Sequence, residues 1–182
     1  MSAGTGLAWL LAALLVSPAA AHPQDEVVQG AYLTLAPGEV RVELDITPGP
    51  QVAEALLRAL DAHADQYITD AEARDYAESV LRQSTLMLDE MALSWRLEKV
   101  RVPPYGTLAL AADTIRIYAV ARRPDRAGTH RLSYENRYAP AKSQVTANVF
   151  LQPGPDWRYE VTGQQRGDDG RHLAVTYTET PR

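Results

Sequence analysis

The sequence predicts a mainly β fold, in which an antiparallel β-sandwich-like domain contains an inserted helix-loop-helix. Apolar and polar residues alternate with the period of a half-buried strand along most of the chain after residue 26. Gly, Pro, Asp and Asn separate these segments at hairpin spacing. Only about residues 51–82 change to the period of an amphipathic helix. Neighbouring antiparallel strands with one helical insertion are typical of a sandwich-like fold.

The N-terminus has the pattern of an export signal. Leu7 to Val16 is an apolar run, about as long as a signal core and too short to span a membrane. Ala19 and Ala21 supply the small side chains that a signal peptidase needs, so we expect cleavage before His22. No Lys or Arg precedes the run, which departs from the usual positive start. The apolar run and the small residues before His22 still predict export, so we expect a periplasmic or extracellular protein.

The predicted signal peptide covers residues 1–21, and residues 22–182 are long enough for a single β-rich domain. All 18 basic and 23 acidic residues follow the signal, so the net charge of −5 belongs to the exported part. A negative net charge disfavours nucleic acid and anionic membrane surfaces as partners. No later segment is apolar enough to span a membrane. The absence of cysteine excludes disulfides, zinc-thiolate sites and thiol nucleophiles.

The first elements are predicted from local pattern. Residues 26–35 and 39–46 flank the turn sequence APGE and form a hairpin. Residues 51–60 then place Val and Leu on one helical face, and a second helix runs from about Asp70 to Arg82. Thr69 followed by Glu72 predicts a capping box for this second helix.

The rest of the chain is predicted to consist of strands. A long alternating segment turns at Asp89-Glu90, and five further segments follow it, which makes about nine strands in all. These five segments are DTIRIYAVARRP, THRLSYENRY, SQVTANVFLQ, WRYEVTGQQR and HLAVTYTE. The RGD tripeptide between the last two is interpreted as part of a hairpin turn, because Asp-Gly follows it.

The loop between the two predicted helices has the ligand spacing of a calcium-binding EF-hand, so the insertion at about 51–82 is EF-hand-like. A calcium ion takes oxygens from loop positions 1, 3, 5, 7, 9 and 12. Position 1 is Asp61, position 5 is Asp65 and position 12 is Glu72. Tyr67 at position 7 would supply its carbonyl, and Thr69 at position 9 its hydroxyl or a bound water.

Two residues depart from that pattern. His63 at position 3 offers a nitrogen, which is a poor ligand for a hard cation. Gln66 stands at position 6, where glycine normally adopts the left-handed conformation that costs other residues about 1–2 kcal/mol. We therefore expect weak calcium binding, with a solvated, ion-free loop as the alternative.

Four stretches together resemble bacterial exported EF-hand-containing proteins and the extracytoplasmic N-terminal domain of nickel/cobalt-transporter-like proteins. They are AHP, GAYLTLAPGEVRVELDITPG, LDAHADQYITDAEA and LSYENRYAPAKSQVTANVFL. The resemblance implies a binding or accessory role beside a membrane or periplasmic protein. The chain departs from that family by having DAHADQ in place of a glycine-bearing loop and by lacking a membrane segment.

A copper site is the alternative function. Cleavage before His22 would leave a histidine whose α-amine and ring nitrogen can chelate Cu(II), with His63, His130 or His172 as the second imidazole. No enzyme signature is present: the chain has no Gly-x-Ser-x-Gly, His-Glu-x-x-His or glycine-rich phosphate loop. We therefore expect a non-catalytic module.

Overall fold

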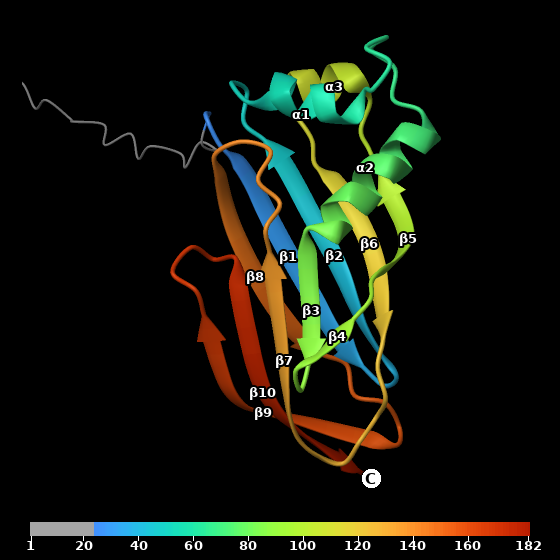
Figure 1. Ribbon diagram of the computed structural model, residues 1–182, viewed down its shortest axis with the longest axis vertical. Helices are drawn as coiled ribbons and strands as arrows, with labels where there is room; N and C mark the ends of the chain where they lie inside the picture. The colour runs from blue at the N-terminus through green and yellow to red at the C-terminus, as the bar shows by residue number, and fades with distance from the viewer. Residues whose placement is uncertain (1–23) are drawn as a thin grey trace, which may run out of the picture.

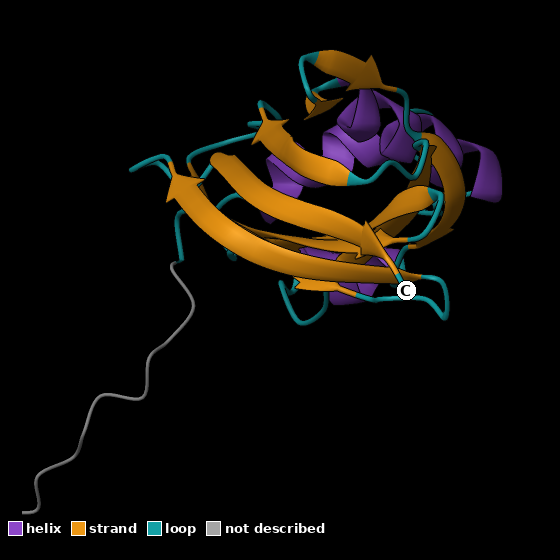
Figure 2. Cartoon of the chain, turned by 90° about the horizontal axis from the view of Figure 1, so that it is seen from below, coloured by secondary structure: helices purple, strands orange, loops and turns teal. Residues whose placement is uncertain are grey.

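The protein is mainly β, with two facing sheets and a small helical part, as seen in a computed structural model that describes residues 24–182 (Figures 1 and 2). The predicted signal peptide and His22 lie outside the described residues. The elements are β1 (Val27–Ala36), β2 (Glu39–Pro48), α1 (Ala53–Leu60), α2 (Asp70–Arg82), β3 (Ser84–Leu88), β4 (Met91–Leu93), β5 (Arg96–Arg101), α3 (Tyr105–Ala109), β6 (Ile115–Arg122), β7 (Gly128–Asn136), β8 (Ser143–Leu151), β9 (Trp157–Arg166) and β10 (His172–Pro181).

The first sheet has the strand order β5-β6-β2-β1-β8, and the second has the order β4-β3-β7-β10-β9. All neighbours are antiparallel except β1 and β8, which pair in parallel from Val27 opposite Ser143 to Leu35 opposite Leu151. The mainly β, sandwich-like prediction is confirmed at this level. The expected purely antiparallel pairing is wrong for β1 and β8, because a strand far along the chain fills that edge.

The strand count was too low by one. The segment after Asp89-Glu90 is two strands, β4 and β5, and they belong to different sheets. The chain leaves the second sheet at Ser94-Trp95 and joins the first sheet beside β6. Alternation continues through this crossing, so the sequence pattern alone did not separate the strands.

The β1–β2 hairpin begins the core. Ala36 pairs with Glu39 across the turn, and Gly38 has a φ of +73°, which glycine adopts without steric cost. Alternate residues of β2 are buried, as predicted, although the strand continues to Pro48 instead of ending at residue 46. The buried members of both sheets form one cluster with the apolar faces of α1 and α2.

The helices close one end and one side of the sandwich. α1 and α3 lie together at the end shown uppermost in Figure 1, and α2 packs against β3 and β5. α2 has the predicted bounds and the predicted capping box, whereas α1 starts at Ala53, two residues later than expected. The short α3 was not predicted. No helix in residues 24–182 is long and apolar enough to cross a membrane.

The opposite side is closed by the β9–β10 turn and β8. A Cβ added to Gly170 would overlap the carbonyl oxygen of Val145, so this turn packs directly on the β8 backbone. The Arg166 guanidinium donates hydrogen bonds to the Ala147 carbonyl and to Asn148 Oδ1. These contacts cover part of the β8 edge, which would otherwise expose unpaired backbone groups. The prediction that the RGD tripeptide lies at a hairpin turn is confirmed.

Candidate functional site

Two residues of the 61–72 loop have a left-handed backbone conformation. Ala64 and Gln66 have φ values of 55° and 64°, so Gln66 does adopt the left-handed conformation expected at position 6. The Asp61 carboxylate accepts hydrogen bonds from the backbone N–H of Asp65 (3.2 Å) and of Gln66 (2.9 Å). The first predicted ligand therefore organises the loop backbone.

The last predicted ligand, Glu72, is also bonded within the chain. Its Oε2 accepts from Thr69 N (2.9 Å) and Oγ1 (2.8 Å), and its Oε1 accepts from His63 N (3.2 Å) and contacts Nδ1 (2.8 Å). The hydrogen bonds from Thr69, followed by those from His63, lower the pKa of Glu72 to about 2. The Glu72 carboxylate in turn raises the pKa of His63.

The Glu72 carboxylate is not placed to bind calcium. A calcium ion needs oxygens that point at a common centre, but each Glu72 oxygen already contacts two donor atoms of Thr69 or His63. Asp65 Oδ1 likewise accepts from Tyr67 N at 2.9 Å. Residues 24–182 contain no group of three or more His, Cys, Asp or Glu side chains placed to hold a metal. Calcium binding at Asp61, Asp65, Tyr67, Thr69 and Glu72 stays a prediction that requires Glu72 to leave His63.

The copper alternative is not tested by the described residues, because His22 is outside them. Each of the three described histidines contacts a carboxylate: His63 lies 2.8 Å from Glu72, His130 lies 2.6 Å from Asp89, and His172 lies 3.1 Å from Glu135. These three pairs lie on separate parts of the fold, in the helical loop, on β7 and on β10. Copper coordination through the nitrogen that faces the carboxylate would have to displace that carboxylate.

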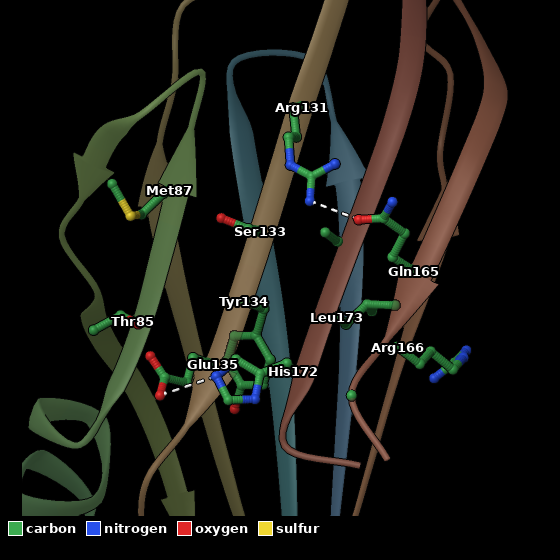
Figure 3. Close-up of a pocket in the computed structure, with 12 residues that line it drawn as sticks. Thr85, Met87, Arg131, Ser133, Tyr134, Glu135, Gln165, Arg166, His172 and Leu173 are labelled. Carbon is green, nitrogen blue, oxygen red and sulfur yellow. Dashed lines mark hydrogen bonds and ion pairs between the residues drawn. The ribbon is translucent and has the colours of Figure 1, made fainter. Parts of the chain in front are cut away.

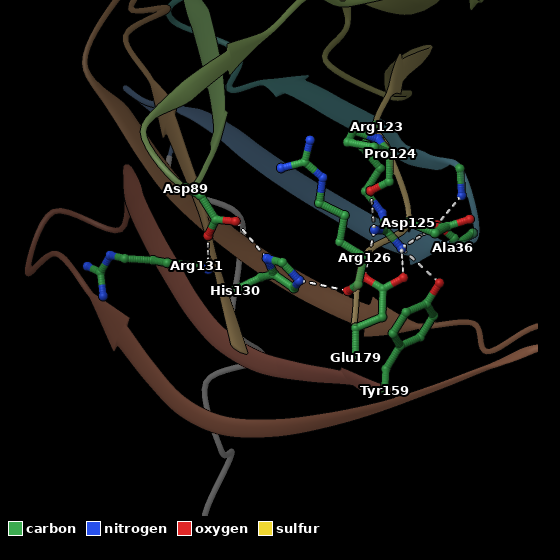
Figure 4. A network of polar contacts seen from close by, with 11 residues as sticks. Ala36, Asp89, Arg123, Pro124, Asp125, Arg126, His130, Arg131, Tyr159 and Glu179 are labelled. Carbon is green, nitrogen blue, oxygen red and sulfur yellow. Dashed lines mark hydrogen bonds and ion pairs between the residues drawn. The ribbon is translucent and has the colours of Figure 1, made fainter. Parts of the chain in front are cut away.

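A buried ionic network joins the two sheets beyond the end of β6 (Figure 4). The Arg123 and Glu179 side chains are 1% and 0% exposed, and Arg123 Nη1 lies 2.8 Å from Glu179 Oε2. Arg123 Nη2 donates to Tyr159 Oη (2.8 Å) and to the Ala36 carbonyl (3.2 Å), and it lies 2.9 Å from Asp125 Oδ1. Contacts to β1, β9 and β10 make this a structural link between the sheets.

His130 and Asp89 lie beside that network. Asp89 Oδ2 lies 2.6 Å from His130 Nδ1, and the Arg126 carbonyl lies 2.8 Å from His130 Nε2. Because both ring nitrogens face acceptors, the imidazolium is the form that satisfies them. The other carboxylate oxygen of Asp89 accepts a hydrogen bond from Arg131 N at 2.8 Å, so this exposed turn residue is also bonded to β7. Asp89 and Glu90 both have positive φ, which is typical of a two-residue hairpin turn.

The outer face of the second sheet contains a groove of about 350 Å³, which we call the outer groove (Figure 3). Met87 on β3 lies on one side of it, and Ser133 and Ala174 form a floor of small side chains. Arg131 Nη2 donates to Gln165 Oε1 at 2.9 Å. His172 and Glu135 pair at 3.1 Å toward the other end. The lining comprises Thr85, Met87, Arg131, Ser133, Tyr134, Glu135, Gln165, Arg166, Gly167, His172, Leu173 and Ala174.

The outer groove has an excess of positive charge on one side. Glu135 already pairs with Arg137 (2.7 Å) as well as with His172, and these partners lower the pKa of Glu135. The Arg131 guanidinium makes no ion pair within residues 24–182, and the neutral amide of Gln165 is its side-chain partner. The guanidinium of Arg131 therefore has donors left for a carboxylate.

No protein-family model matches the chain, and no curated protein is significantly similar to it. The assignment of a site therefore depends on geometry. Sequence reasoning missed Arg131, Ser133 and Ala174, although each occupies an outward position of an alternating strand. The sequence does show small residues at these outward positions. It does not show that they lie opposite one another, because the register of the strands is a tertiary property.

Proposed function

We propose that the protein is an exported, non-catalytic binding module whose ligand occupies the outer groove. The observation that supports this is the Arg131 guanidinium, which makes no ion pair in the part of the chain that the structure describes and lies beside a floor of Ser133 and Ala174. The groove volume of about 350 Å³ falls in the range of small-molecule sites. An accessory role beside a membrane or periplasmic protein, which the family resemblance implies, is compatible with such a module.

The ligand class is a small carboxylate with an apolar body. A guanidinium presents a planar pair of N–H donors that matches a carboxylate, and this pairing gives both energy and orientation. Met87 and Ala174 offer apolar contacts on the groove surface next to Arg131. A ligand bound in this way would lie across β3, β7 and β10, which hydrogen-bond as one rigid sheet.

Catalysis by the same groove is disfavoured by the geometry of His172. Ser133, His172 and Glu135 share the groove, which suggests a nucleophile, a base and an orienting carboxylate. However, His172 Nε2 lies 3.1 Å from Glu135 and Nδ1 lies 3.7 Å from Asp169, so both nitrogens face carboxylates. Among the described residues, Ser133 and His172 form no hydrogen bond with each other. The base is therefore not directed at the hydroxyl.

Ligand-observed NMR with benzoate tests this proposal, with benzamide as the uncharged counterpart of the same shape. We expect saturation transfer to benzoate but not to benzamide. Arg131→Gln should weaken benzoate binding about tenfold or more. Arg158→Gln is the matched control, because Arg158 is an exposed arginine of the same sheet outside the groove. Equal binding of benzoate and benzamide would contradict the proposal. An equal loss of benzoate affinity in Arg131→Gln and Arg158→Gln would also contradict it.

Weak calcium binding by the 61–72 loop is a second candidate. The left-handed conformation of Gln66 and the closed turn around Asp61 favour it, because both preserve the loop shape that a calcium site uses. The His63–Glu72 contact opposes it. The variant His63→Asp with Gln66→Gly, compared with the natural sequence, tests whether the His63–Glu72 contact opposes the ion.

A further inference from the structure

The outer face of the first sheet has exposed aromatic side chains around a second groove, of about 430 Å³. Tyr32, Tyr118 and Phe150 line this groove, and we call the surface the aromatic face. Phe150 is the single phenylalanine of the chain, and it is 54% exposed. Tyr32 is 38% exposed. A chain that leaves its one phenylalanine in water, next to an exposed tyrosine, has an apolar surface available for contact.

Strand register places these rings on one face. Tyr32 on β1 lies opposite Glu43 on β2, and Glu43 lies opposite Tyr118 on β6. On the other side of β1, Thr34 lies opposite Phe150 on β8. Since residues opposite one another and residues two apart point to the same face of a sheet, the three rings share the outer surface.

Gly30 allows the Tyr32 ring to lie against the sheet. A Cβ at Gly30 would lie 2.9 Å from Tyr32 Cε2 and 2.9 Å from its Oη, which is closer than atoms tolerate. The ring therefore folds back along its own strand onto the glycine backbone, leaving the other side of the ring exposed. Glycine in a strand is typical of a place where another group approaches the backbone closely.

The charged side chains that line the aromatic face are paired within the chain. Arg41 Nε lies 3.3 Å from Glu39, and Glu98 lies 2.9 Å from Arg96. Glu43 accepts a hydrogen bond from the Tyr118 hydroxyl at 3.2 Å and lies 4.0 Å from Arg116. A charged ligand would have to break these pairs, so the electrostatics of this face favour a neutral ligand.

We infer that the aromatic face binds a neutral oligosaccharide. The C–H faces of sugar rings stack on aromatic rings, and their hydroxyl groups hydrogen-bond to side chains such as Thr34, Arg41 and Glu43, which line the same groove. This site is on the opposite sheet from the outer groove and uses different residues. Sugar binding here goes beyond the proposed function. It can be present or absent independently of benzoate binding at Arg131, which is measured separately.

The single phenylalanine provides a direct reporter. Protein grown with 4-fluorophenylalanine has one ¹⁹F resonance, at position 150, which can be titrated with cellohexaose and with chitohexaose. We expect a saturable shift with at least one of these sugars, and no shift with glucose at the same concentration. Tyr32→Ala should weaken the binding about fivefold or more. Tyr67→Ala is the control, because Tyr67 is 68% exposed but lies in the helical loop. The sugar affinity of this variant should stay within about twofold of that of the unmodified protein.

Three results would overturn the inference. The first is a ¹⁹F resonance that neither hexasaccharide shifts. The second is a sugar affinity, measured by the ¹⁹F titration, that is unchanged in Tyr32→Ala, because the sugar would then bind elsewhere. The third is a resonance that changes with protein concentration without sugar, together with a dimer in light scattering, which would mean that a second copy covers this face. Since both tyrosines are surface residues, circular dichroism should show that both variants keep the native fold.

Discussion

Arg123 and Glu179 form an ion pair inside the sandwich, 2.8 Å apart between Nη1 and Oε2, and neither side chain is more than 1% exposed. The pair joins the end of β6 to β10, and so connects the two sheets. Removing one partner leaves the other charge buried without compensation. We expect Glu179→Gln and Arg123→Met each to lower the free energy of unfolding by about 3–5 kcal/mol.

Equilibrium denaturation in urea measures these losses. The double variant Arg123→Met with Glu179→Gln removes both charges together, and should lose less stability than the sum of the single variants. Additive losses would show that the two side chains do not interact in solution.

The His130–Asp89 pair should make stability depend on pH. Burial opposes the charge on His130, but the contacts with Asp89 and the Arg126 carbonyl prevail and raise the pKa above its ordinary 6.5. A raised pKa in the folded state stabilises the fold fully below the unfolded value, and this contribution is lost as pH rises through the folded pKa. Glu179 also acts on His130 from β10 and raises its pKa. Urea denaturation should show a lower free energy of unfolding at about pH 9 than at about pH 5.5. In the His130→Gln variant this difference should be smaller.

Glu72 should contribute to stability on the acid side. Its pKa falls from 4.5 to about 2 because of the hydrogen bonds from Thr69 and then from His63. A lowered pKa contributes stability above the unfolded value of 4.5, and this contribution is lost as pH falls toward about 2. Glu72→Gln should flatten the stability profile in that window. Thr69→Ala removes the cap and should cost about 1 kcal/mol. A profile unchanged in Glu72→Gln would contradict the assignment.

Calcium dependence should appear when the loop is freed from His63. In the variant His63→Asp with Gln66→Gly, an oxygen replaces the imidazole and glycine relieves the left-handed backbone at position 6. A site of about 1 mM affinity in about 10 mM calcium would add about 1.4 kcal/mol and raise the melting temperature by about 3–6 °C. The unmodified loop should show a smaller shift, because Glu72 remains in contact with His63 and Gln66 keeps its left-handed conformation.

Terbium luminescence gives an independent readout, since Tyr67 lies in the loop and can sensitise a bound ion. Adding Glu72→Gln to the same variant should abolish both signals. A calcium response in the natural sequence as large as in the variant would show that the His63–Glu72 contact does not oppose the ion.

Two glycines with similar conformations should differ in their tolerance of alanine. Gly38 and Gly170 have φ values of +73° and +70°, but a Cβ at Gly38 meets no atom within 4 Å. Gly38→Ala should therefore cost only about 1 kcal/mol, the penalty for the left-handed conformation. Gly170→Ala also places its Cβ against the Val145 carbonyl and must push the β9–β10 turn away from β8. Equal melting temperatures for the two variants would contradict this closure of the sandwich.

The elements that the sequence predicted best depend on neighbours within a few residues. The bounds of α2 and its capping box follow from Thr69 and Glu72, which are three positions apart. The alternation of β2 follows from the side-chain period of a strand. The conformation of Gln66 followed from its place in the loop pattern. The candidate calcium ligands stay a prediction, and their hydrogen-bond partners within the loop were not anticipated.

The amino-acid sequence by itself determined the mainly β class, the helices α1 and α2 and the left-handed conformation of Gln66, because each depends on local periodicity, capping and turn chemistry. Only the tertiary structure decided that β8 pairs in parallel with β1, that β5 leaves the sheet of β4, and that Arg123 meets Glu179. It also decided that His63 bonds to Glu72. The outer groove and the aromatic face have the same origin, since each is assembled from outward residues of several strands. Their alignment depends on strand register, which is fixed by packing across the whole core and not by any one segment.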